Sequence, residues 1–160
     1  MPKFSAGVLL YRGGGAQLEV LLAHPGGPFW AKKEKGAWSL PKGEVDGAES
    51  LEERARIELR EETGVDLAGA PLTPLGQVTQ ANGKVVAAFA AQRDVDVTTC
   101  RSNTIMIEWP PRSGRQIEIP EVDRVAWFEI ETARTRINPA QAAFLDRLLS
   151  WLAGVTNEGA

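Results

Sequence analysis

The spacing of hydrophobic residues in the first quarter of the chain predicts strands separated by turns. Residues 4–11 and 18–23 are nearly continuous apolar runs, and residues 13–15, three glycines, indicate a hairpin turn between them. Residues 24–36 are rich in glycine, proline and lysine, which predicts an irregular loop. A short strand is expected over residues 37–40, where the chain becomes apolar again.

Residues 50–63 form the most strongly predicted helix. Ser50 stands where a hydroxyl can accept a hydrogen bond from the first turn, and Glu53, three residues later, completes a capping-box pattern. Gly64 is expected to end the helix, because glycine readily adopts the left-handed backbone conformation found there.

Further strands are predicted in the second half of the chain. Residues 75–80 and 85–92 flank the pair at 82–83, Asn-Gly, which is a strong hairpin signal. Residues 103–109 and 122–130 also have strand-like patterns, and the PPRSGRQIEIP segment between them is expected to be a loop.

A second helix is expected to begin at Asn138, with Pro139 in its first position and Gln141 completing another cap. Gly154 is expected to end it. Its apolar stripe consists of Phe144, Leu145, Leu148, Leu149 and Leu152. Many strands with two clear helices predict a mixed α/β or α+β domain.

The composition bounds the class of protein. A length of 160 residues fits one domain over residues 1–160, with its core at about 4–153. Cys100 is the only cysteine, which excludes an intrachain disulfide and a cysteine zinc site and agrees with a cytoplasmic protein. No apolar run approaches the roughly 18 residues that span a bilayer. The scattered bases leave no strong nucleic-acid signal, so neither a membrane nor a nucleic acid is expected as a partner.

The net charge of −3 is unevenly distributed, because residues 44–62 hold eight acids and three bases and sum to −5. On the predicted helix Glu58, Glu61 and Glu62 fall in one sector of about 100° that borders the apolar face. A divalent cation such as Mg²⁺ or Mn²⁺ would relieve the repulsion between such carboxylates. A solvated charged face is the alternative, but the glycine loop at 40–47 favours metal-assisted phosphate chemistry.

Residues 43–65, GEVDGAESLEERARIELREETGV, resemble the Nudix box of the MutT-like Nudix hydrolases. The matching positions are Gly43, Glu49, Glu58, Leu59, Glu61, Glu62, Gly64 and Val65. The resemblance implies an α/β/α sandwich with a mixed central sheet. It also implies divalent-metal-dependent hydrolysis of a pyrophosphate bond in a nucleoside diphosphate linked to another group.

The resemblance also implies roles for individual residues. The implied metal ligands are Glu58, Glu61, Glu62 and the backbone carbonyl of Gly43. Glu49 and Gly64 are implied to be structural residues of the box. The general base would come from the box itself or from a later loop, where Glu121 is preferred and Glu118 stands behind it. A surface carboxylate at the end of a loop is the alternative interpretation of Glu121.

One position departs from the family pattern, because Ile57 stands where the family has an arginine that orients the box carboxylates. Loss of this charge is expected to raise the carboxylate pKa values or to loosen the geometry, which predicts reduced but real activity. Arg54, Arg56 and Arg60 are close enough in sequence to substitute. Arg54 precedes Glu58 by four residues, which is the less favourable order for such a pair.

The clues to the substrate are weaker. The GAWSLPKGE lead-in, which contains Lys42, is similar to family members that act on dinucleoside polyphosphates. Trp30 could stack on a base, and Arg112 and Arg115 could clamp a phosphate as bidentate donors. The alternatives are that Trp30 pins its loop to the core and that both arginines are simply exposed. A homodimer is expected only by analogy with the family.

Three classes of function follow. The first is a Nudix pyrophosphohydrolase with a small-molecule nucleotide or polyphosphate substrate. The second is a Nudix-like regulatory module that holds a nucleotide without cleaving it, which only Ile57 favours. The third is a calcium-binding helix, but the chain lacks the alternating Asp/Asn loop that calcium-binding helix pairs use.

Overall fold

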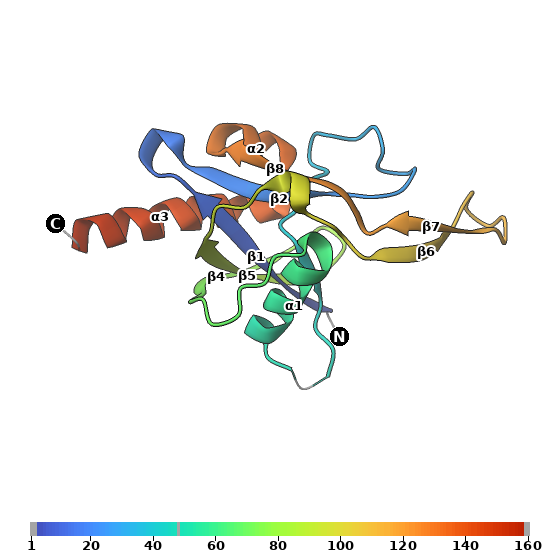
Figure 1. Ribbon diagram of the computed structural model, residues 1–160, viewed down its shortest axis with the longest axis horizontal. Helices are drawn as coiled ribbons and strands as arrows, with labels where there is room; N and C mark the ends of the chain where they lie inside the picture. Colours follow the sequence, from blue (N-terminus) through green and yellow to red (C-terminus); the bar gives the residue numbers. More distant parts are fainter. Residues whose placement is uncertain (1–2, 48, 159–160) are drawn as a thin grey trace.

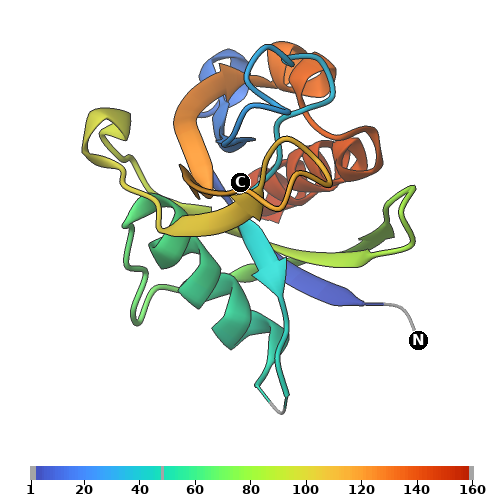
Figure 2. The ribbon, with the colours of Figure 1, turned by 90° about the vertical axis from the view of Figure 1, so that its right-hand side faces the viewer.

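The computed structural model describes residues 3–47 and 49–158, with side chains as far as residue 154. It is an α/β/α sandwich in which a mixed sheet separates α1 from α2 and α3 (Figures 1 and 2). The strands are β1 (Phe4–Arg12), β2 (Glu19–Pro25), β3 (Lys42–Glu44), β4 (Thr73–Thr79), β5 (Val85–Gln92), β6 (Thr104–Glu108), β7 (Gln116–Pro120) and β8 (Val122–Glu129). The helices are α1 (Leu51–Thr63), α2 (Ile130–Arg136) and α3 (Ala142–Glu158). Among the described residues, no helix is long and apolar enough to cross a bilayer.

The main sheet has the strand order β4-β5-β1-β2-β8, and its centre is split. β1 runs parallel to β5 along its length, but it pairs with β2 only near their hairpin, at Tyr11–Val20 and Arg12–Glu19. The first half of β1 pairs with β3 instead. The segment that leads into β3 therefore lies between the two central strands, which brings the predicted glycine loop to the middle of the sheet.

Gly7 on β1 permits this insertion. A Cβ atom there would lie 2.2 Å from the carbonyl oxygen of Pro41 and 2.3 Å from Cδ1 of Leu40. Gly7→Ala is therefore expected to lower the free energy of unfolding by about 1–3 kcal/mol, as overpacking does. Urea unfolding would measure the change. Gly14→Ala is the control, because Gly14 is extended and has open space around it; an equal loss in both variants would contradict this reason.

Both faces of β1 are buried, which explains why its sequence is a continuous apolar run rather than an alternating one. Ala6, Val8 and Leu10 pack in the core beneath α1, whereas Leu9 and Tyr11 pack in the core beneath α3. Each helix layer thus rests on its own apolar cluster, with the sheet between them.

The predicted ends of α1 are confirmed. The Ser50 hydroxyl accepts a hydrogen bond from the backbone nitrogen of Glu53 at 3.0 Å. Gly64 ends the helix with a φ of 85°, in the left-handed region. Ala55 and Leu59 are fully buried against the sheet, so the helix turns the face that borders its carboxylates inward.

The segment from residue 37 to residue 44 differs from the prediction. The strand expected over residues 37–40 is reduced to two isolated bridges, Ala23 with Ser39 and Trp38 with Ile137. The regular strand is β3, which lies in the predicted glycine loop. The reason is the split sheet. The first half of β1 is not paired with β2 and so pairs with residues 42–44 instead of residues 37–40.

The region after β6 also differs from the prediction. The expected loop contains β7, which pairs with β6 as a projecting hairpin in which Ile105 faces Ile119 and Ile107 faces Ile117 (Figure 1). The strand predicted to reach residue 130 ends at Glu129, and α2 follows it. No side chain caps the start of this seven-residue helix, so the sequence carries no capping signal for it.

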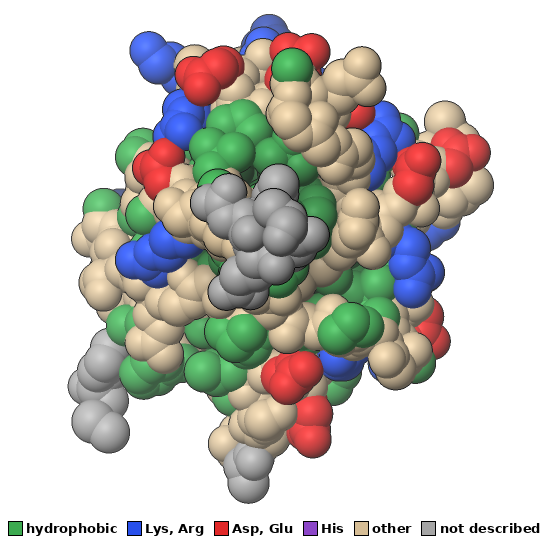
Figure 3. All heavy atoms as spheres, turned by 90° about the vertical axis from the view of Figure 1, so that its left-hand side faces the viewer, with side chains coloured by type: hydrophobic (Ala, Val, Ile, Leu, Met, Phe, Trp, Pro, Cys, Tyr) green, Lys and Arg blue, Asp and Glu red, His purple; other side chains and the backbone are tan. Residues whose placement is uncertain are grey.

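The last helix begins near the predicted position but ends later. Asn138 caps a 3₁₀ turn, Pro139–Gln141, by accepting from the Ala140 nitrogen at 3.0 Å. Gln141 does not complete that cap, because its buried side chain bonds Leu40, Ser39 and Gln80 instead. α3 continues through Gly154 to Glu158, so the predicted stop was wrong; a helical glycine costs only about 1 kcal/mol. Hydrophobic side chains gather on the face of the molecule that Figure 3 shows.

Candidate active site

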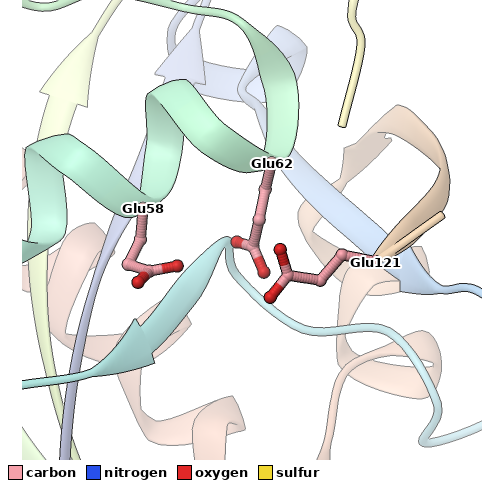
Figure 4. A group of neighbouring side chains, drawn as sticks. All are labelled: Glu58, Glu62 and Glu121. Carbon is pink, nitrogen blue, oxygen red and sulfur yellow. The ribbon is translucent and has the colours of Figure 1, made fainter. Parts of the chain in front are cut away.

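Three glutamates from two elements meet beside β3. Glu58 and Glu62 lie one turn apart on the inward face of α1, and Glu121 immediately precedes β8. One carboxylate oxygen from each residue lies within 4.8 Å of the others (Figure 4). Figure 4 shows the Glu62 and Glu121 side chains pointing toward each other from opposite elements. The four-residue spacing on α1 brings Glu58 and Glu62 together, and the tertiary fold brings Glu121 to them.

Two members of the group, Glu58 and Glu62, are buried, Glu121 is half-buried, and the three carboxyl groups repel one another when charged. Glu58 is 6% exposed and Glu62 is 8% exposed, and within the described part of the chain the Oε2 atom of Glu62 has no hydrogen-bond partner. Burial, together with the charges of Glu121 and Glu58, raises the pKa of Glu62 to about 9. Burial also raises the pKa values of Glu58 and Glu121. An oxygen-binding cation would remove this penalty, so the residues present fit a divalent metal.

A short strap of backbone holds the two elements together. The Arg101 nitrogen donates to the Thr63 carbonyl at 3.0 Å, and the Asn103 nitrogen donates to the Glu61 carbonyl at 2.9 Å. The Glu121 nitrogen donates in turn to the Asn103 carbonyl at 2.9 Å. The strap, residues 101–103, therefore fixes the distance between the end of α1 and the start of β8.

Gly43 on β3 lies against the Glu58 carboxylate. A Cβ atom on Gly43 would lie 2.0 Å from the carboxyl carbon of Glu58 and 2.2 Å from its Oε1 atom. Only glycine allows backbone and carboxylate to approach so closely. This cradle is consistent with the predicted pairing of a backbone carbonyl and carboxylates around one ion.

Lys42 lies at the edge of the same group. A hollow of about 160 Å³ is lined by Pro25, Ser39, Leu40, Lys42, Glu62 and Glu121, among others. Burial lowers the pKa of Lys42 despite the opposing charge of Glu62. The hollow thus combines two carboxylates with one ammonium group, an arrangement that suits a metal-bound phosphate.

Arg54 makes the ion pairs with box carboxylates that Ile57, an apolar residue, cannot make. Its guanidinium donates from Nε and Nη2 to Glu49 at 2.6 and 3.0 Å, and from Nη1 to Glu58 at 3.0 Å. Arg56 instead binds two backbone carbonyls beyond the helix. The less favourable sequence order did not prevent the Arg54 contact, because Glu49 also holds the guanidinium.

A family profile described as "NUDIX domain" matches residues 1–148. The chain belongs to the NUDIX family. It is a Nudix hydrolase with the pyrophosphohydrolase activity of that family, whose enzymes use divalent metals. Among curated proteins, none matches this sequence.

Solved structures support the fold of this Nudix hydrolase. An Ap4A hydrolase of C. elegans in a binary complex has a TM-score of 0.69 at 20% identity, over 94% of this chain and 98% of that chain. The NUDIX domain of Shewanella oneidensis NrtR, complexed with ADP ribose, has a TM-score of 0.65 at 20% identity, over 95% of this chain and 89% of that chain. A mutT/nudix family protein from Listeria innocua has a TM-score of 0.63 at 20% identity, over 98% of each chain.

Other residues predicted for the site lie outside the glutamate group. Glu61 lies on the same helix, α1, but is not one of the three glutamates that approach one another. Glu118 is exposed on β7. Arg112 and Arg115 lie in the exposed turn of the β6–β7 hairpin, whose backbone is capped by the Glu108 carboxylate. The structure thus brings together the core of the predicted site but not its predicted phosphate clamp.

Trp30 lies in a loop that is fixed at both ends, residues 26–36. The Gly26 nitrogen donates to the Glu121 carbonyl at 3.1 Å. Near the other end, the buried His24 ring contacts the Lys33 carbonyl at 2.6 Å and the Asp123 carboxylate at 2.9 Å. No pattern in the sequence predicts these contacts, which attach the aromatic part of the loop to the strand that follows Glu121.

Proposed function

We propose that this Nudix hydrolase cleaves a pyrophosphate bond in a nucleoside diphosphate linked to another group, with Mg²⁺ or Mn²⁺ as cofactor. The observation that carries the proposal is the buried Oε2 atom of Glu62, which has no hydrogen-bond partner among the described residues and lies beside two other carboxyl groups. Glu58, Glu62 and the Gly43 carbonyl would hold the cation, and Glu61 stays a predicted ligand. The bound cation would neutralise phosphate oxygens and lower the pKa of water.

The protein's own residues would position the substrate and accept a proton. Lys42, at the edge of the hollow, is placed to bind a phosphate oxygen. Glu121 is our candidate for the general base, because its carboxyl group points toward Glu62 from the other side of the group and burial raises its pKa (Figure 4). Arg112 and Arg115 remain candidates for contact with more distant phosphates.

Dinucleoside polyphosphates are the substrate class that we favour. Phe29 is 54% exposed and packs edge-on against Trp30, and the Lys33 ammonium lies 3.6 Å from the centre of the Phe29 ring. An exposed aromatic pair with a cation suits the stacking of a base next to phosphates. The similar fold of an Ap4A hydrolase supports this choice, and that of a domain complexed with ADP ribose makes ADP-ribose the alternative.

A substrate panel tests the proposed function. Diadenosine tetraphosphate, ADP-ribose, a nucleotide sugar and ATP would each be incubated with Mg²⁺ or Mn²⁺, and released nucleoside monophosphate or phosphate would be measured. We expect the highest kcat/KM for the dinucleotide. Tight binding of a nucleotide without turnover of any substrate would support the regulatory module instead. A cytoplasmic location and a homodimer stay predictions.

Trp30→Ala tests the stacking role. We expect the KM for diadenosine tetraphosphate to rise on the order of 10-fold with little change in kcat, since losing one stacked base costs about 1–3 kcal/mol. Steady-state kinetics on the dinucleotide would measure it, with circular dichroism to check the fold. An unchanged KM would mean that Trp30 only anchors its loop.

A further inference from the structure

Arg54 joins two parts of the candidate site that are separate in the sequence. Glu49 belongs to the segment between β3 and α1, and Glu58 lies in the third turn of α1. One guanidinium binds both carboxylates through three hydrogen bonds. We propose that Arg54 is a positioning residue that holds the Glu58 carboxylate in place for a divalent cation; this inference rests on the proposed function.

The surroundings of the three side chains make these contacts strong. The side chains of Arg54, Glu49 and Glu58 are 17%, 18% and 8% exposed. Charged hydrogen bonds are stronger where water is excluded, and the two-pronged contact with Glu49 also fixes the orientation of the guanidinium plane. Glu49 is itself held, because its carboxylate accepts from the Asp46 nitrogen at 2.8 Å. The contacts with Glu49 therefore hold the Arg54 guanidinium in place independently of Glu58.

Glu58 is confined between this guanidinium and the backbone of β3. Gly43 forms one wall, so close that a methyl group would not fit. Arg54 forms the other and is the only basic side chain in the described part of the chain that pairs with Glu58. Without it, the carboxylate would be free to rotate away from Glu62 and Glu121, and one of the positive charges that oppose their repulsion would be lost.

In this chain the side chain of residue 57 takes no part in the contacts that join Arg54 to Glu49 and Glu58. The Ile57 side chain lines a hollow on the outer surface of α1 together with Glu53, Arg60 and Asp66. An arginine there would have Glu53 and Glu61, one turn before and one turn after it, as acidic neighbours on the helix. The positioning role therefore belongs to residue 54 in this chain, because its guanidinium binds Glu58 while the side chain of residue 57 lines a different hollow.

The test compares four variants by Mn²⁺ affinity, measured by electron paramagnetic resonance of free Mn²⁺, and by kinetics on diadenosine tetraphosphate. They are Arg54→Met, Arg60→Met, Ile57→Arg and the double variant Arg54→Met/Ile57→Arg. Arg60→Met is the matched control, since Arg60 is exposed on the same helix. We expect Arg54→Met to weaken Mn²⁺ binding about 10- to 100-fold, the usual range for a group that supports a metal ligand. Its kcat should fall while its KM changes little.

The remaining variants make the result decisive. Arg60→Met and Ile57→Arg should keep the wild-type Mn²⁺ affinity, and the double variant should stay as weak as Arg54→Met. Wild-type affinity in Arg54→Met, or its recovery in the double variant, would overturn the proposal. If Arg54→Met does not fold, Glu49→Gln should weaken Mn²⁺ binding by releasing Arg54, and an unchanged affinity would again overturn it. The Mn²⁺ measurement remains informative even if no panel substrate is cleaved.

Discussion

Glu62→Gln should abolish hydrolysis and, at the same time, make the metal-free protein more stable above neutral pH. The catalytic loss should be on the order of 1,000-fold, because a central oxygen ligand and its charge are removed from the cation. The gain in stability follows from the pKa of Glu62, which folding raises from an ordinary 4.5 to about 9. The folded protein therefore holds a proton that the unfolded chain releases.

The sign of the pH dependence follows from this linkage. Between about pH 4.5 and 9 the native state binds the extra proton, so its free energy of unfolding falls as the pH rises through that window. The slope approaches 1.4 kcal/mol per pH unit for one fully coupled group. Glutamine imitates the protonated side chain and carries no such penalty. Urea unfolding with a chelator at several pH values would compare Glu62→Gln with the wild type.

Two controls accompany this comparison. Glu118→Gln removes an exposed carboxylate on β7 and should leave both turnover and the pH dependence unchanged. Added Mn²⁺ should stabilise the wild type by mass action and Glu62→Gln much less. If the stability of the wild type does not fall relative to that of Glu62→Gln as the pH rises, folding does not raise the pKa of Glu62 in the metal-free state.

Gly43→Ala should be the most damaging change outside the carboxylates. Its methyl group would lie 2.0 Å from the carboxyl carbon of Glu58, so the side chain or β3 must move. We expect Mn²⁺ affinity and kcat to fall by about 100-fold or more, because displacing a ligand costs at least as much as removing its support. The free energy of unfolding should also fall by about 1–3 kcal/mol.

A double variant separates the steric effect from the catalytic one. Gly43→Ala/Glu58→Ala removes the carboxylate that the methyl group would strike, so its stability should recover toward that of Glu58→Ala. Its activity should not recover. If the double variant is as unstable as the sum of its parts, the collision with Glu58 is not the cause of the loss.

The local features of α1 could be predicted from the sequence because they depend on neighbouring residues. The Ser50 cap, the Gly64 stop and the inward face that carries Glu58 and Glu62 all follow from spacing along one helix. The approach of Glu121 depended on the family resemblance, since nothing local relates it to a helix some sixty residues earlier. Hydrogen bonds between main-chain atoms, such as those of the strap, do not depend on side-chain type and so cannot be predicted from the pattern of side chains.

The contact made by Arg54 shows another limit of local rules. Helix spacing placed Arg54 within reach of Glu58 but in the weaker order. What that rule omits is Glu49, which lies outside the helix and binds the same guanidinium in two places. In the same way, α2 has no cap and β7 is embedded among arginine, glycine and proline, so their tertiary partners, rather than local signals, define them.

The strap makes the spacing of the site independent of most side chains that surround it. Its bonds from Arg101 and Asn103 use main-chain atoms alone, so they survive replacement of either side chain by any residue other than proline. The two carboxylate-bearing elements can thus keep their separation while the surface above them changes. Substitutions of the Arg101 and Asn103 side chains offer a way to alter which molecules reach the site without disturbing the ligands beneath it, whereas the Ser102 hydroxyl accepts from the Val122 nitrogen and should be kept.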